Sequence, residues 1–367
     1  MINQNTPKLR FKNFDDEWTT HQILDIADRF DNLRVPITSS DRNAGSTPYY
    51  GANGIQDYVQ GFTHDGEFVL IAEDGANDLK DYPVHYVEGQ IWVNNHAHVL
   101  SGKKDKLDNT FFKNRLKQSN FEKYLVGGSR AKLNADILMK MPIKVPSLPE
   151  QSAIGALFQT LDELLSAYKD NLANYQAFKA SMLSKMFPKA GQTTPEIRLD
   201  GFDGEWEEKK LGDTCQVNSG RDYKHLSEGN IPVYGTGGYM LSINDKLSDK
   251  DAIGIGRKGT IDKPFLITAP FWTVDTLFFV TSNNKTDLNF LFQIFNRISW
   301  KKYDESTGVP SLSKKTIQIV KEYFPSLEEQ KAIGDFFSSI DDLISSCQEK
   351  IEQLETLKKK LLQDMFV

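Results

Sequence analysis

The most constraining feature of this chain is that its 367 residues carry the same pattern twice. Three stretches of the first half recur in the second: 7–18 at 195–206, 50–54 at 234–238, and 146–187 at 325–366. The shifts are 188, 184 and 179 residues, and the third pair shares 16 identities without a gap. A period this long indicates duplicated domains rather than a solenoid of small repeats.

The closing segments, 146–187 and 325–366, have the apolar spacing of long helices. Apolar residues alternate in steps of four and three, a heptad seam that Lys179 and Lys358 interrupt at the same place in both copies. A helix of about 38 residues is roughly 57 Å long, so we expect the two helices to pair as an antiparallel coiled coil rather than lie in a core. The expected seam residues are Ile154, Phe158, Leu161, Leu165, Tyr168, Leu172, Tyr175, Met182, Ile333, Phe337, Ile340, Ile344, Cys347, Ile351, Leu354 and Leu361.

The segments before these helices contain short β-branched and apolar runs separated by Gly, Pro, Asn and Asp, which predict strands. The clearest runs are 67–71, 90–93, 251–255 and 276–280. One amphipathic helix is expected late in each segment, at about 110–126 and about 287–303. The fold class is therefore α+β. We expect a first globular domain at 1–145, helices at 146–187 and 325–367, a linker at 188–195 and a second globular domain at 196–324.

Composition narrows the class of protein. Only two cysteines occur, Cys215 and Cys347, so neither a disulfide framework nor a cysteine-based zinc site is expected. No run of eighteen apolar residues and no secretory signal is present, which favours a cytoplasmic protein without a membrane partner. The net charge is −6, yet 113–144 carries eight basic and two acidic residues, and 297–321 carries six basic and two acidic. Charge is segregated, and the basic stretches are candidate contacts for phosphates.

Motifs for catalysis are weak. The stretch 254–259 matches G-x-G-x-x-G, but the residues after it are poor helix formers and stop at Pro264, so a dinucleotide site is not expected. His96 and His98 share one face of a strand without an evident third ligand, so we regard them as structural histidines and expect no metal site, although a metal role stays open. Neither a phosphate loop, a nucleophile elbow nor an Asn-Pro-Pro-aromatic tetrad occurs. No catalytic residues are predicted.

Several basic residues lie beside glycine-containing loops, a setting that suits contact with a phosphate backbone. A turn with solvated charges is the plainer alternative for 257–258. The residues predicted to contact phosphate are Lys123, Arg130, Lys132, Arg257, Lys258, Lys314 and Lys315.

These features together resemble the specificity subunit of type I restriction-modification systems. The resemblance rests on the two openings, 7–18 and 195–206, on the helix starts of pattern Pro-Ser-Leu-x-Glu-Gln-x-x-Ile-Gly, and on the Met-Phe pairs that end each helix. It covers essentially the whole chain.

The resemblance implies that each globular domain is a target recognition domain that reads one half of a gapped, bipartite sequence in double-stranded DNA. The helix pair fixes the gap and docks two modification subunits, and motor-nuclease restriction subunits join through the complex. S-adenosylmethionine, ATP and magnesium then belong to partners, and this chain holds no cofactor. Because the two middles differ, the target should be asymmetric. We expect base contacts from Asn53, Gln56, Asn77, Thr236 and Asn244. Subunit contacts are expected from the off-seam residues Leu157, Leu164, Phe178 and Leu183.

Other interpretations remain. A stand-alone methyltransferase would need a cofactor pocket and the missing tetrad. A structural adaptor with tandem binding domains on a coiled coil would need no basic loops. Within the family, the chain could serve a system that methylates without cleaving.

Overall fold

The computed structural model describes residues 6–127 and 131–366 and separates into two compact units. Unit 1 comprises Met1–Lys169 and Glu349–Val367, and unit 2 comprises Asp170–Gln348. The division passes through both long helices, α4 (Leu148–Lys185) and α8 (Leu327–Asp364). Each unit therefore holds one globular part, one half of α4 and one half of α8.

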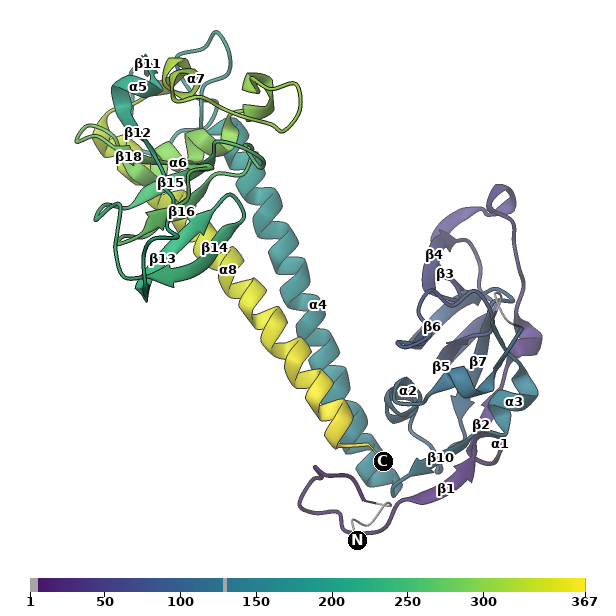
Figure 1. The fold of residues 1–367 in the computed structure, drawn as a ribbon. Coiled ribbons are helices and arrows are strands. Elements are labelled where there is room, and N and C mark those ends of the chain that lie inside the picture. The colour runs from purple at the N-terminus through teal and green to yellow at the C-terminus, as the bar shows by residue number, and fades with distance from the viewer. Residues whose placement is uncertain (1–5, 128–130, 367) are drawn as a thin grey trace. The chain divides into compact units, whose positions relative to one another are not determined.

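Unit 1 is built on a six-stranded sheet of order β2-β7-β5-β6-β3-β4, with helix α2 (Asn109–Lys117) beside it (Figure 1). The strands are β2 (Ala27–Arg29), β3 (Ala44–Gly51), β4 (Gly54–Val59), β5 (His64–Ala72), β6 (Val84–Val93) and β7 (Ala97–Gly102). Smaller elements are β1 (Thr19–Gln22), α1 (Ile23–Ile26), the 3₁₀ turns η1 (Asp31–Leu33), η2 (Ser39–Asp41) and η3 (Phe121–Tyr124), β8 (Leu125–Val126), β9 (Lys132–Leu133), α3 (Ala135–Met139) and β10 (Pro142–Val145). Strand β1 pairs with β10, so the start and end of the globular part are joined.

Unit 2 repeats this plan with a four-stranded sheet, β12-β18-β15-β16, and a three-stranded one, β14-β13-β17. The strands are β12 (Cys215–Ser219), β13 (Glu228–Gly235), β14 (Gly238–Ile243), β15 (Ala252–Gly256), β16 (Phe265–Ile267), β17 (Trp272–Thr273) and β18 (Leu277–Ser282). The other elements are β11 (Glu207–Lys210), α5 (Leu211–Thr214), α6 (Leu288–Arg297), η4 (Trp300–Tyr303), α7 (Lys314–Ile319) and β19 (Lys321–Phe324). β11 pairs with β19 as β1 pairs with β10.

The sheets differ because one long strand of unit 1 is broken in unit 2. In unit 1, β6 pairs with β5 over its length and also in parallel with β3 at Trp92. In unit 2 these roles fall to β16, which pairs with β15, and to β17, which pairs in parallel with β13 at Trp272. Pro270 lies between β16 and β17, and proline cannot donate a ladder hydrogen bond.

The repeated helix start is explained by one buried ion pair in each unit. Glu150 is fully buried in the first turn of α4, and Arg10 donates to its two oxygens over 2.7 Å each. In the same way, Arg198 donates to the two carboxylate oxygens of Glu329 in α8, at 2.8 and 2.7 Å. Two parallel hydrogen bonds fix orientation as well as charge. The repeated openings of the chain are thereby anchored to the repeated helix starts.

The next residues of the motif complete this junction. Gln151 accepts the backbone N–H of Asp108 and donates to two carbonyls, and Gln330 does the same from the backbone N–H of Asp287. A Cβ on Gly155 would lie 1.9 Å from the Thr110 hydroxyl, so α4 can approach α2 this closely only at glycine. The motif therefore reflects the close packing of α4 on α2 and of α8 on α6.

The Met-Phe pairs at the helix ends belong to hydrophobic cores. Phe187, at the end of α4, stacks on Phe290 and lies against Trp206 and Phe337 in the core of unit 2. Phe366, at the end of α8, occupies the equivalent place in unit 1, against Trp18, Phe111 and Phe158. The residues that follow α4 thus belong to the core of unit 2, and the residues that follow α8 belong to the core of unit 1.

Within each unit the halves of α4 and α8 run antiparallel, as expected. Every predicted seam residue is buried or half-buried. The lysines that interrupt the seam carry interhelical ion pairs: Lys179 Nζ lies 2.5 Å from Asp341 in unit 2, and Lys358 pairs with Asp162 in unit 1. The coiled-coil prediction is confirmed, and the breaks in the seam are paired charges.

The four predicted strands are confirmed in β5, β6, β15 and β18. The predicted helices at 110–126 and 287–303 were too long, because α2 ends at Lys117 and α6 ends at Arg297. In unit 1, Asn120 caps the separate turn η3 by accepting the N–H of Glu122. An asparagine that bonds to nearby backbone favours such a break over helix continuation.

Candidate functional site

Two predicted base-reading residues of unit 1, Asn53 and Asn77, lie together because the Asn53 side chain hydrogen-bonds to the backbone of a neighbouring loop. Asn53, in the turn between β3 and β4, donates to the Gly75 carbonyl and accepts the backbone N–H of Asn77, both at 2.9 Å. The third residue, Gln56, is exposed on β4 and accepts a long 3.4 Å bond from Asn94. Asn53 and Asn77 therefore lie at one exposed edge, and the Asn53 amide is already satisfied by backbone.

The predicted base readers of unit 2 lie on the corresponding hairpin. Thr236 is in the turn between β13 and β14, half-buried, and Asn244 follows β14 and is exposed. The side chain of Asn244 accepts the backbone N–H of Ser227 at 3.2 Å. In both units the candidate amides shape a surface loop, the place where recognition residues are commonly carried.

The three predicted phosphate contacts of unit 1 have different surroundings. Lys123 is exposed in η3. Arg130 lies outside the described residues. Lys132, in β9, forms a 2.8 Å ion pair with Glu73, which raises the pKa of the lysine and neutralises its charge locally. Local sequence patterns do not indicate this pairing, because Glu73 precedes Lys132 by 59 residues.

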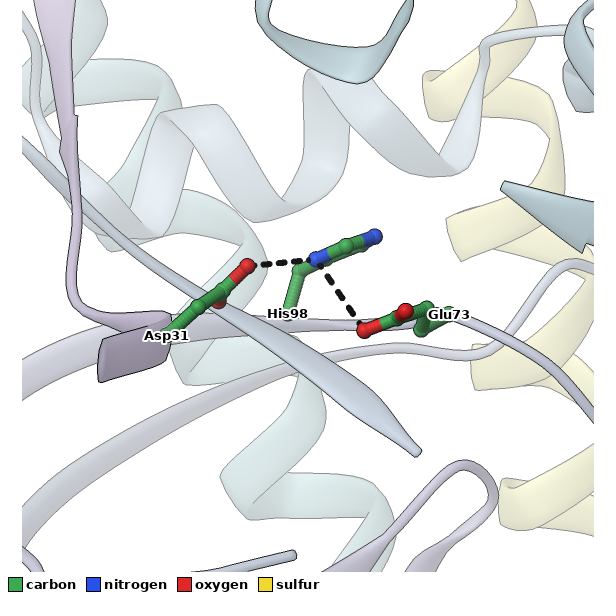
Figure 2. A group of neighbouring side chains, drawn as sticks. All are labelled: Asp31, Glu73 and His98. Carbon is green, nitrogen blue, oxygen red and sulfur yellow. Dashed lines mark hydrogen bonds and ion pairs between the residues drawn. The ribbon is translucent and has the colours of Figure 1, made fainter. Parts of the chain in front are cut away.

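Lys132 belongs to a network of charges at one end of β5 and β7. The carboxylates of Asp31 and Glu73 both point toward Nδ1 of His98, at 2.7 and 3.7 Å (Figure 2). The other ring nitrogen, Nε2, lies 2.8 Å from the Leu133 carbonyl. A ring with a proton on each nitrogen would donate to the Asp31 carboxylate from Nδ1 and to the Leu133 carbonyl from Nε2. His98 is almost fully buried, so the ring ties three segments of unit 1 together.

Arg34 completes this network by donating to Glu73 at 2.6 Å. Burial opposes ionisation of Asp31, but the His98 hydrogen bond, the Val99 N–H and Arg34 together hold its pKa below the usual range. For Glu73 the same opposition by burial is outweighed by Lys132 and Arg34, which lower its pKa. Opposite charges within a few ångströms favour the ionised forms.

The network supplies the third ligand type that the spacing of His96 and His98 did not reveal. Oxygen and nitrogen atoms of Asp31, Glu73 and His98 lie within 4.8 Å of one another. Glu73 is already paired with Arg34 and Lys132, however, so a cation entering there would have to displace both. His96 points elsewhere and pairs with Asp74 at 2.5 Å.

The predicted basic residues of unit 2 do converge. Arg257, Lys258 and Lys314 line one open pocket of about 370 Å³. Three serine residues and Phe278 complete its polar and aromatic lining, and the Arg257 guanidinium lies 5.9 Å from the Phe278 ring centre. Lys315 is exposed on α7, outside this pocket. After Gly256 the chain bends toward β16, so the G-x-G-x-x-G stretch does not open a helix.

The off-seam residues differ in exposure. Leu164 and Phe178 are 43% and 46% exposed, whereas Leu157 and Leu183 are half-buried against the cores of units 1 and 2. The repeat reveals two further residues that sequence reasoning missed: Leu343 and Leu357, 179 positions after Leu164 and Phe178, are 46% and 45% exposed. The shift of 179 itself was the signal that could have identified them.

Comparison with known proteins agrees with this architecture. The model of the type I restriction modification DNA specificity domain matches residues 15–175 and again 203–356. A putative type I restriction enzyme specificity subunit of Haemophilus influenzae is 30% identical over 350 residues, covering 91% of this chain and 89% of that protein. The MjaVIII specificity subunit of Methanocaldococcus jannaschii is 23% identical, covering 95% and 91%.

Among solved structures, the S subunit of a type I restriction-modification system from M. genitalium has the same fold, with a TM-score of 0.79. Its sequence is 19% identical, and the match covers 99% of both chains. Among the helices of residues 6–127 and 131–366, none is both long and apolar enough to span a bilayer. The two family matches coincide with the two repeats of sequence and structure, and the chain belongs to the type I restriction modification DNA specificity family.

Proposed function

We propose that this chain is the DNA-reading, non-catalytic subunit of a type I complex in which partner subunits methylate adenine and cleave DNA. The observation that carries the proposal is the architecture: two recognition units, each anchored on an antiparallel helix pair, in a chain that belongs to the DNA specificity family. Two similar readers on one scaffold suit two half-sites on a duplex. S-adenosylmethionine, ATP and magnesium would be held by the partners.

The two units differ in their surface loops and surface charges, so we propose that the half-sites differ and that the target is asymmetric. The hairpin of unit 1 presents Asn53 and Gln56, whereas the hairpin of unit 2 presents Thr236 and exposed Tyr239. Amide, hydroxyl and aromatic groups pair with different base edges. These differences lie on loops, whereas the junction between the globular part and the long helix is the same in both units.

Two modification subunits would dock on the helix pair. Support comes from the two pairs of exposed apolar residues at equivalent positions, Leu164 with Leu343 and Phe178 with Leu357. Phe178 also contacts Phe336, the equivalent of Leu157, with ring centres 6.2 Å apart. Exposed apolar groups that occur twice in the same setting suit two copies of one partner.

Co-expression with a type I modification subunit of the same organism, followed by mapping of adenine methylation across the host genome, tests the proposal. We expect a single gapped, asymmetric motif. Replacing residues 1–145 with the corresponding part of a relative should change one half of that motif only. A stable complex that adds no new methylation would contradict the DNA-reading role and favour an adaptor.

Docking is tested by Leu164→Glu combined with Leu343→Glu. We expect the double variant to stay folded, because both side chains are exposed, yet to lose the modification subunits in gel filtration. The matched control is Ala167→Glu with Ser346→Glu, two exposed positions on the same helices that are also related by 179. Equal retention of partners by both double variants would contradict this docking surface.

A further inference from the structure

The two units carry the same backbone site with opposite charge. In unit 1 an isolated bridge joins Asp74 to Lys132, and the Leu133 N–H donates to the Glu73 carbonyl at 2.7 Å. In unit 2 the equivalent bridge joins Lys258 to Ser311, and the Leu312 N–H donates to the Arg257 carbonyl at 3.0 Å. Glu73 and Asp74 therefore correspond to Arg257 and Lys258, each pair lying just after the central strand of its sheet.

The sheet registers extend this correspondence to the neighbouring strands. His98 faces Ile71 across β5 and β7, and Phe278 faces Ile255 across β15 and β18. Ser219 pairs with Phe278 at the end of β12, where unit 1 has Asp31 hydrogen-bonded to His98. The ion network of unit 1 is thus replaced in unit 2 by serine, phenylalanine and arginine.

These replacements remove the ion-paired carboxylates from the site. In unit 1 the Glu73 carboxylate lies between Arg34 and Lys132, so the positive groups already hold an anion. In unit 2, within the part of the chain that the structure describes, no carboxylate forms an ion pair with Arg257, Lys258 or Lys314.

Two acids lie beside the pocket, and both hydrogen-bond to neutral groups. The Asp304 carboxylate accepts the backbone N–H of Ser311 at 2.9 Å and both the N–H and the hydroxyl of Ser306. Glu305 accepts the Ser313 hydroxyl at 2.9 Å and also the Thr316 hydroxyl, so its carboxylate is engaged with α7. The pocket of about 370 Å³ that results is open to solvent, and its lining holds three cations and three serines beside Phe278 and Leu312.

We propose that this pocket of unit 2 binds a phosphate of the DNA backbone, and that unit 1 fills the equivalent site with its own Glu73 carboxylate. The groups that would hold the phosphate are Ser219, Arg257, Lys258, Ser311 and Lys314, since the Ser313 hydroxyl already donates to Glu305. Arginine, lysine and serine are the usual protein partners of backbone phosphates. This inference rests on the proposed function, because a duplex must lie over unit 2.

A backbone phosphate fits better than a free anion for two reasons. Arg257 and Lys258 are exposed at the mouth, where they can meet a ligand that extends beyond the pocket. Lys315, which follows Lys314 in α7, is exposed and adds positive charge next to the pocket. A chain of phosphates gains from charges that a single small anion would not reach.

The test uses the complex with modification subunits. It compares the pocket variant, which combines Arg257→Gln and Lys314→Gln, with the unit 1 variant Lys132→Gln. DNA affinity is measured by fluorescence anisotropy over a range of salt concentrations, with a duplex that carries the methylated motif and an unrelated one. We expect the pocket variant to bind both duplexes roughly tenfold more weakly. Its salt slope should fall by about one for each phosphate that the variant no longer neutralises.

The unit 1 variant should keep the wild-type salt slope, because Lys132 already pairs with Glu73. Lys209→Gln combined with Lys210→Gln, both on β11 outside the pocket, removes the same number of positive charges from unit 2. Both controls should bind DNA as the wild type does. A pocket variant that still forms the complex and gives a wild-type circular dichroism spectrum excludes misfolding as the cause.

Inorganic phosphate distinguishes the two sources of the anion. Unchanged DNA binding by the pocket variant, together with loss of the thermal stabilisation that phosphate gives the wild type, would overturn the DNA assignment in favour of a free anion. Unchanged behaviour toward both would overturn the anion site. A wild-type complex that binds neither duplex would contradict the proposed function itself, and that failure is visible without any variant.

Discussion

Unit 1 and unit 2 share the junction between the globular part and the long helices, whereas they differ at the end of the central strand of the sheet. Both anchor an opening arginine on a buried glutamate, Arg10 on Glu150 and Arg198 on Glu329. Both insert a Met-Phe pair beside a tryptophan. At the end of the central strand, however, unit 1 closes an ion network and unit 2 opens a basic pocket. The repeated residues hold the scaffold, and the two units differ at the end of the central strand.

The largest expected effect tests whether the two cores are as equivalent as they look. Phe187 and Phe366 are both buried among three aromatic rings, so Phe187→Ala and Phe366→Ala should each lower the free energy of unfolding by about 4 kcal/mol. Hydrogen exchange read by mass spectrometry should place the loss of protection in unit 2 for Phe187→Ala and in unit 1 for Phe366→Ala.

Leu357→Ala, an exposed position on α8, serves as the control and should cost well under 1 kcal/mol. Loss of protection in the globular part that precedes the mutated helix, rather than in the other one, would contradict the assignment of each Met-Phe pair to its core.

How far the sequence predicted this arrangement depends on the range of the contacts. The α+β class, the strands and the seam follow from local periodicity, and the repeat made the two helix starts recognisable. The partners of those starts could not be inferred, because Arg10 meets Glu150 across a whole domain. The excess length predicted for the helix at 110–126 came from apolar spacing that continues past Asn120, whose side chain caps a new turn instead.

The candidate site was predicted less well for the same reason. Arg257, Lys258 and Lys314 were each predicted from loop chemistry, but their meeting in one pocket depends on β15 and on the turn before α7. Lys132 was predicted by the same reasoning and lies against Glu73. Charge and loop position identify basic residues, whereas only the sheet register shows which of them are left without a carboxylate partner.

The second prediction concerns the interhelical ion pairs and is smaller. Asp162 in unit 1 has two lysine partners, Lys113 and Lys358, whereas Asp341 in unit 2 is paired with Lys179. Lys179→Met should therefore cost about 1 kcal/mol, and Lys358→Met less than half of that, because Lys113 remains beside Asp162. Both carboxylates are about a third exposed, so solvent screening keeps the effects modest.

Urea unfolding of the full chain, with hydrogen exchange to assign each loss to a unit, measures this difference. Lys113→Met combined with Lys358→Met should raise the cost in unit 1 to that of Lys179→Met. Equal costs for the two single variants would show that Lys113 contributes nothing to Asp162 and would remove this asymmetry from the comparison.

The smallest expected effect is the response of the two strand-end sites to acid. Asp31 and Glu73 have folded-state pKa values below their ordinary ones, so each contributes stability that is present above its unfolded pKa, about 3.9 and 4.3. That contribution is lost as the pH falls through the lower, folded values. Ser219 and Arg257 hold the equivalent places in unit 2, where unit 1 has these two carboxylates. From pH 6 to pH 3, hydrogen exchange corrected for intrinsic rates should therefore show β7 and β9 losing more protection than β18. Asp31→Asn should remove much of that difference, since it deletes one of the two carboxylates. Equal acid sensitivity in both units, or an unchanged difference in the variant, would mean that the ion network in unit 1 does not set its stability in acid.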